Sequence, residues 1–201
     1  MAMTAQPRLR PLPPADWDDD AFEALSAAFS DGLVKHIRQT GRAPNVLATM
    51  MHHPALSGPF NVYGNVLLKQ PAIGHRAREL MLLRVAWRTG ARYEWVHHAL
   101  LAPQYDVTEQ DIGAITRGIV ADGWTPLERD LVAAADEMLD SYRVSDDTWN
   151  RLAEQLDERQ LIEIPLLVGT YTCLAMAFNS WELQVEDDVD TTGLPLPPAP
   201  A

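Results

Sequence analysis

The stretch of residues 78–98, RELMLLRVAWRTGARYEWVHH, constrains the fold of this chain more than any other. Its apolar residues recur at the three- and four-residue spacing of a helix, and Gly90 interrupts the pattern. Glycine often follows the last residue of a helix, because it adopts a left-handed backbone without strain. The stretch therefore predicts two helices, over residues 75–88 and 92–102, which can pack antiparallel across a short turn.

The rest of the chain carries the same helical patterns, and no segment shows the sustained alternation of a half-buried strand. Thr108 and Asp111 match a capping box, a common helix start. These signals predict an all-α class with a single helical domain over residues 16–186. Further helices are expected over residues 16–36, 46–53, 55–69 and 157–178, and from Thr108, Thr125 and Ser145.

Two terminal segments flank this domain. Residues 1–15 are rich in Pro and Arg, which predicts an extended or disordered segment. Residues 187–201 are acidic and then Pro-rich, and we expect them to be disordered or docked on a neighbouring chain.

Composition and charge exclude several classes of partner. The 201 residues carry a formal net charge of −12, which opposes binding to nucleic acid or to an anionic membrane. No apolar run reaches the roughly 18 residues needed to span a membrane, and the N-terminus lacks the apolar core of a signal peptide. We expect a cytoplasmic protein that acts on a small molecule.

Cys173 is the one cysteine of the sequence. A disulfide within one chain and a dithiol redox cycle within one chain are both impossible as a result. The thiol lies in the apolar run LLVGTYTCLAMAF. We expect it to be buried in the core, where free cysteines are common.

Glu79, Glu94 and His98 are the candidate catalytic residues. Glu94 and His98 are four residues apart and share one face of a helix, and antiparallel packing could bring Glu79 to the same face. Beside an ionised carboxylate, a histidine favours its protonated form and can shuttle a proton. The alternative is an ordinary surface pair worth only about 0.3–0.5 kcal/mol.

Four further residues are candidates for contact with a substrate. Arg84 lies inside an apolar run and could hold a substrate carboxylate or pair with Glu79, because a buried arginine needs a partner. Tyr93 could donate a hydrogen bond or simply pack, Trp95 is expected to wall the pocket, and His53 could line its mouth. No spacing of metal ligands and no phosphate-binding glycine motif is present, so we expect no metal and no cofactor.

The spacing from Glu79 to His98 resembles the pattern E-x11-C-x2-C-x3-H of the alkyl hydroperoxidase D proteins. The two cysteine positions hold Ala91 and Glu94. The chain is therefore more similar to the carboxymuconolactone decarboxylase branch of that superfamily, in which both cysteines are absent. The segments HHPALSGPFNVYGNVLL and LLVGTYTCLAMAFNSWE extend the resemblance over roughly residues 40–185.

This resemblance implies a helical bundle whose subunits associate, often in threes or multiples of three, although a dimer is also possible. It implies a cofactor-free lyase that acts on a small, carboxylated lactone or activated carbonyl acid, with Glu79, Glu94 and His98 at the reactive positions. An isomerase, hydratase or dehydratase would use the same proton-transfer groups. A peroxidase-like antioxidant is disfavoured by the missing cysteine pair, and a non-catalytic binding or assembly protein could be built on the same fold.

Overall fold

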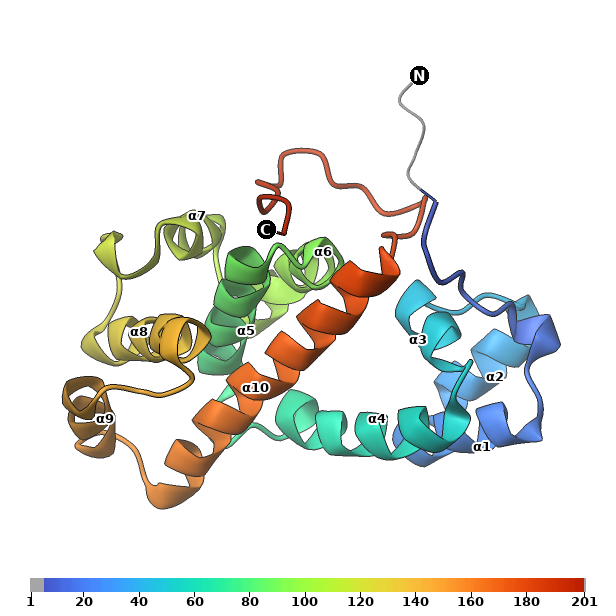
Figure 1. Ribbon diagram of the computed structural model, residues 1–201, viewed down its shortest axis with the longest axis horizontal. Coiled ribbons are helices and arrows are strands. Elements are labelled where there is room, and N and C mark those ends of the chain that lie inside the picture. The colour runs from blue at the N-terminus through green and yellow to red at the C-terminus, as the bar shows by residue number, and fades with distance from the viewer. Residues whose placement is uncertain (1–5, 201) are drawn as a thin grey trace. The chain divides into compact units, whose positions relative to one another are not determined.

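The computed structural model describes residues 6–200, and these residues contain α-helices and short 3-10 helices but no β-strand (Figure 1). The predicted all-α class is confirmed. The chain forms two compact units, one from Met1–Lys69 with Ser180–Val189 and the other from Gln70–Asn179 with Asp190–Ala201. The expectation for residues 1–15 falls partly outside the described residues, and the part from residue 6 to residue 13 has no helix.

The first unit contains α1 (Asp19–Ala28), α2 (Asp31–Thr40), α3 (Asn45–Met50) and α4 (Pro54–Lys69). The single helix predicted over residues 16–36 is wrong, because the chain breaks there into α1 and α2. Ser30 accepts a hydrogen bond from the backbone of Leu33 and so caps a new helix. The apolar spacing runs on through this break, which is why the pattern alone does not reveal it.

Helices α1 and α4 of this unit pack closely at Gly58. A side chain there would place its Cβ only 3.2 Å from the Cβ of Ala24. The close approach lets the unit enclose a small core around the fully buried Leu25 and Ile37, with Trp17 and Met51 beside them.

The second unit is built around α5. This helix packs against α6, α7 and α8, and nearly every side chain from Arg78 to Ala86 is buried. Its C-terminus ends at Gly90, whose φ of +67° is the left-handed conformation predicted from the sequence. The helices of this unit are α5 (His75–Thr89), α6 (Arg92–Leu101), α7 (Glu109–Arg117), α8 (Pro126–Ser141), α9 (Asp146–Ala153) and α10 (Glu158–Trp181), with 3-10 helices η2 (Ala102–Tyr105) and η3 (Gly118–Val120).

Helix α10 is long and apolar enough to cross a membrane, with a mean hydropathy of 1.7 over its best 18 residues. The expectation that no apolar run reaches this length is therefore wrong. Core helices pass the same test, and 33% of that window is buried here. Length and hydropathy alone consequently assign no membrane role to α10.

The C-terminal tail packs on its own chain, in place of the expected disorder or docking on a neighbour. The indole Nε1–H of Trp95 donates to the carbonyl of Pro195 at 2.5 Å. A Cβ at Gly90 would lie 2.6 Å from the carbonyl oxygen of Pro198. The tail therefore covers the turn between α5 and α6 and the first turn of α6.

Candidate acid–base site

Helices α5 and α6 bring Glu79 and His98 into direct contact. The two oxygens of the Glu79 carboxylate lie 3.1 and 3.0 Å from the imidazole Nδ1 of His98. Glu79 is completely buried, whereas 12% of the His98 side chain is exposed. Glu79 and His98 therefore meet across the turn at Gly90, as the predicted packing of the two helices requires.

Glu94 completes the group from the opposite side of the imidazole. Its Oε2 lies 3.3 Å from the Nε2 of His98, one helical turn further along α6. Each ring nitrogen of His98 therefore faces a carboxylate, and a ring that donates to both carboxylates must carry both protons. All three candidate catalytic residues converge.

The contacts of the site set its charge at neutral pH. Burial lowers the pKa of His98, but hydrogen bonds and attraction from Glu79 and Glu94 outweigh this and raise the pKa to about 9. Burial raises the pKa of Glu79, while His98 and Arg78 lower it further than burial raises it. At neutral pH, His98 is consequently an imidazolium and Glu79 a carboxylate.

Arg78 and Tyr171 belong to this site, although the sequence patterns did not single them out. The Nη2 of Arg78 donates to the Oε1 of Glu79 at 2.6 Å. The Tyr171 ring on α10 meets the His98 ring edge-on, with centroids 5.8 Å apart. Burial and the charges of Glu94 and Glu79 raise the pKa of Tyr171, so the phenol keeps its proton. The available signal for the arginine was its place beside Glu79, just before the apolar run LMLLRVAW.

Arg84 does not face Glu79, so the predicted pairing is wrong. Its Nε and Nη2 donate to the two carboxylate oxygens of Asp136 at 2.7 and 2.9 Å, and its Nη1 donates to the carbonyl of Ile115 at 2.6 Å. Gly118 leaves the space for this guanidinium, since a Cβ there would lie 2.6 Å from Nη2. Arg84 therefore ties α5 to α8 instead of offering its fork to a substrate carboxylate.

The predicted aromatic neighbours are buried around α6. Tyr93 packs against the rings of His97 and Phe178, with centroids 4.3 and 5.6 Å away. Trp95 is fully buried, stacks obliquely on Trp87 and bonds the tail. These contacts are those of packing residues.

His53 lies in the first unit with an exposed side chain. Its assignment to the pocket stays a prediction.

Cys173 is exposed, and the expectation of a buried thiol is wrong. It lies on a face of α10 whose other large side chains are also exposed, at Ile162, Leu166 and Met176. Apolar residues surround this helix on all sides, so its sequence does not distinguish the buried face from the exposed one.

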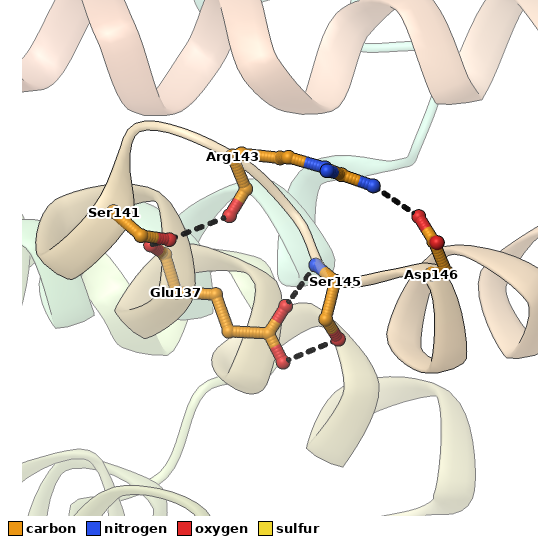
Figure 2. Close-up of a pocket in the computed structure, with 5 residues that line it drawn as sticks. All are labelled: Glu137, Ser141, Arg143, Ser145 and Asp146. Carbon is orange, nitrogen blue, oxygen red and sulfur yellow. Dashed lines mark hydrogen bonds and ion pairs between the residues drawn. The ribbon is translucent and has the colours of Figure 1, made fainter.

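Two other features of the described residues bear on ligand binding. Among residues 6–200, no group of three or more His, Cys, Asp or Glu side chains is placed to hold a metal ion. A surface hollow of about 280 Å³ lies between α8 and α9, and its lining includes none of Glu79, Glu94 and His98 (Figure 2). Its Glu137 carboxylate accepts hydrogen bonds from Ser145, and its Arg143 pairs with Asp146. These polar groups already satisfy one another and hold the turn between the two helices.

The region of the chain that carries the acid–base group matches a known protein family. Residues 54–137 match the carboxymuconolactone decarboxylase family. The match contains α5 and α6 complete, and with them Glu79, Glu94 and His98.

One protein to which this chain is similar is the uncharacterized protein YdfG of Bacillus subtilis (strain 168). The two are 27% identical over 115 residues, which cover 56% of this chain and 74% of that protein.

Several solved structures share the fold of this chain. An alkylhydroperoxidase AhpD core protein from Ralstonia eutropha JMP134, described as peroxidase-related, has a TM-score of 0.74 at 16% identity, over 96% of this chain and 100% of that one. A variant of the debrominase Bmp8, in complex with 2,3,4-tribromopyrrole, has a TM-score of 0.69 at 18% identity, over 93% and 95% of the two chains. At these identities the likeness is one of fold.

Proposed function

We propose that this protein is a cofactor-free enzyme that transfers protons on a small molecule with an activated carbonyl group, as a lyase of the decarboxylase type. The observation that carries the proposal is the position of His98, with a carboxylate at each ring nitrogen. An imidazolium held in this way is a positioned acid, and a carboxylate beside it is a positioned base. The match to the carboxymuconolactone decarboxylase family supports the same class of reaction.

Each group has a defined task in such a reaction. In a decarboxylation, the bond between the carboxylate carbon and its neighbour breaks, CO₂ leaves, and the electron pair passes into an enolate. When the substrate takes the place of the Glu94 carboxylate at Nε2, this N–H of the His98 imidazolium donates a hydrogen bond to the enolate oxygen, which stabilises the developing charge. A proton from the imidazolium then goes to carbon, and a proton from solvent, passed on by Glu94, restores the imidazolium. Glu79 holds the ring in place throughout.

An isomerase would use the same residues with no loss of carbon. Glu94 would remove a proton beside the carbonyl, and the proton would return at a second carbon. A thiol peroxidase, by contrast, needs a reactive cysteine at the site, and positions 91 and 94 hold Ala and Glu. The peroxidase-related names of some proteins of this fold therefore do not carry over to our proposal.

The experiment that tests the proposal is hydrogen exchange into candidate substrates in D₂O, followed by NMR. A panel of small lactones and activated carbonyl acids is incubated with the wild type, with His98→Ala, and with His36→Ala as a control on an exposed histidine. We expect deuterium incorporation or CO₂ release that is lost in His98→Ala alone. Equal rates for wild type and His98→Ala would remove His98 from the mechanism and favour a binding or assembly protein.

We further propose that copies of this chain associate through the exposed face of α10. Ile162, Leu166, Cys173 and Met176 give this face no charge, so two copies with a formal charge of −12 can approach there without like charges in contact. Light scattering on wild type, on Leu166→Lys and on Val120→Lys, an exposed apolar residue on η3, tests the surface. A fall in mass for Leu166→Lys alone supports it, and three equal masses contradict it.

A further inference from the structure

We propose that Arg78 is a positioning residue of the acid–base site, which holds the Glu79 carboxylate charged and turned toward His98. The inference rests on the proposed function, because it assigns a role within the same site. It concerns a residue that neither the spacing of the candidate catalytic residues nor the family match singles out. Arg78 touches Glu79 and not the imidazole, so it acts through the carboxylate.

The surroundings of Arg78 are those of a residue fixed in place. Its side chain is completely buried, as is that of Glu79, and the Nη2 to Oε1 distance of 2.6 Å is that of a strong charge-assisted hydrogen bond. Its Nη1 lies 3.0 Å from the Nδ1 of His75. The guanidinium carbon lies 4.4 Å from the ring centre of Tyr105, which also stacks on His75. Three neighbours thus hold the guanidinium.

The contact with Glu79 is not the default for adjacent residues of a helix. Neighbouring side chains diverge by about 100° around the helix axis. The Arg78 side chain must therefore fold back to reach the carboxylate, and His75, one turn earlier, and Tyr105, from η2, hold it there. A buried arginine thus orients one carboxylate.

The orientation matters because the same oxygen serves two partners. The Oε1 of Glu79 accepts from Arg78 while it also lies 3.1 Å from the Nδ1 of His98. A buried carboxylate that lost its arginine would be driven toward the protonated form, which could no longer attract the imidazolium. Arg78 thus keeps Glu79 able to anchor His98.

The titratable side chains that contact the site of Arg78 and Glu79 come from four elements packed together. His75 and Arg78 come from α5, Glu94 and His98 from α6, Tyr105 from η2 and Tyr171 from α10. Arginine has only donors, so in its contact with Arg78 the Nδ1 of His75 is the acceptor. Arg78 is the one cation that contacts Glu79 besides His98 among the contacts of residues 6–200.

The experiment is a pH titration of the Glu79 carboxyl carbon and the His98 ring by NMR on ¹³C-labelled protein, which requires no substrate. Glu79→Gln and His98→Gln provide the assignments. Arg78→Gln removes the charge and keeps amide donors, and Arg84→Gln is the matched control, since Arg84 is also a buried, carboxylate-paired arginine of α5. We expect Arg78→Gln to raise the pH at which Glu79 takes up its proton by about 1–3 units, and Arg84→Gln to leave it unchanged.

A second variant keeps the test open if Arg78→Gln does not fold. Arg78→Lys retains the charge, but a single ammonium group cannot hold His75 and Glu79 in the fork geometry of arginine. The His98 ring signals of this variant should differ from those of the wild type. Unchanged Glu79 titration in Arg78→Gln, an equal change in Arg84→Gln, or identical His98 signals in Arg78→Lys would each overturn the role. Failure of the exchange experiment with normal titrations would instead overturn the proposed reaction alone.

Discussion

Glu79 and His98 meet from consecutive helices, with both oxygens of the carboxylate within 3.1 Å of one imidazole nitrogen. A carboxylate accepts and does not donate when ionised, so the Nδ1 of His98 must carry a proton. The second nitrogen then decides the state of the ring, and it faces Glu94. The pair of helices therefore fixes both the orientation and the protonation of one side chain.

The first prediction concerns the source of this protonation. Glu79→Gln removes one negative charge from His98 and should lower the His98 pKa from about 9 by about 1–3 units, as expected for the loss of an adjacent opposite charge. Histidine ring NMR over a pH series measures the shift. Glu163→Gln is the control, because Glu163 is also buried but binds the backbone of Ala72 and Ile73. A His98 titration that ignores Glu79→Gln would contradict the assignment.

The second prediction is the pH dependence of stability. The pKa of His98 is raised in the folded chain, so its stabilisation is complete below its ordinary value of 6.5 and is lost as pH rises through about 9. The pKa of Glu79 is lowered, so its stabilisation is present above its ordinary value of 4.5 and is lost as pH falls further. Thermal unfolding should show the difference in Tm between wild type and His98→Gln shrinking from pH 6.5 to 9. A difference that grows over this range would contradict the sign.

The third prediction concerns the ion pair between Arg84 and Asp136. Arg84→Met removes two charge-assisted hydrogen bonds from Asp136, which keeps Arg88 as a partner, and should cost about 1.5–3 kcal/mol of unfolding free energy. Arg143→Met breaks a pair whose side chains are 71% and 82% exposed, and should cost less than about 1 kcal/mol. Urea unfolding of both variants gives the comparison. Equal costs would mean that the Arg84 pair is no stronger than a surface contact.

The fourth prediction concerns the tail. Trp95→Phe keeps the ring but removes the donor to Pro195, and should cost about 1 kcal/mol and loosen residues 190–200. Limited proteolysis detects the loosening as faster cleavage of the tail. Trp87→Phe alters the neighbouring ring without touching that hydrogen bond, so it should leave the tail protected. Equal cleavage of both variants would show that the hydrogen bond does not hold the tail.

Local signals in the sequence predicted much of the fold and the heart of the site. The turn at Gly90 and the capping box of Thr108 both occur as predicted, because each depends on backbone geometry within a few residues. The convergence of Glu94 and His98 followed from helical spacing, and the short turn brought Glu79 to the same place.

The choice of partners could not be predicted in the same way. Arg78 and Arg84 both lie on α5, and each needs an anion when buried. Asp136, which binds Arg84, is 52 residues away on α8, and nothing local encodes that meeting. The same limit applies to Cys173, because the sequence of a helix that is apolar on all sides does not show which face is exposed.

The packing of the tail against Trp95 and Gly90 has a practical consequence for work with this protein. A purification tag or reporter joined to the C-terminus would extend directly from the segment that seals the start of α6. A fused domain would displace that segment and so disturb α6, the helix that carries Glu94 and His98. Tags and surface tethers therefore belong at the N-terminus. A loss of function after C-terminal fusion would reflect the displaced tail and not the site residues themselves.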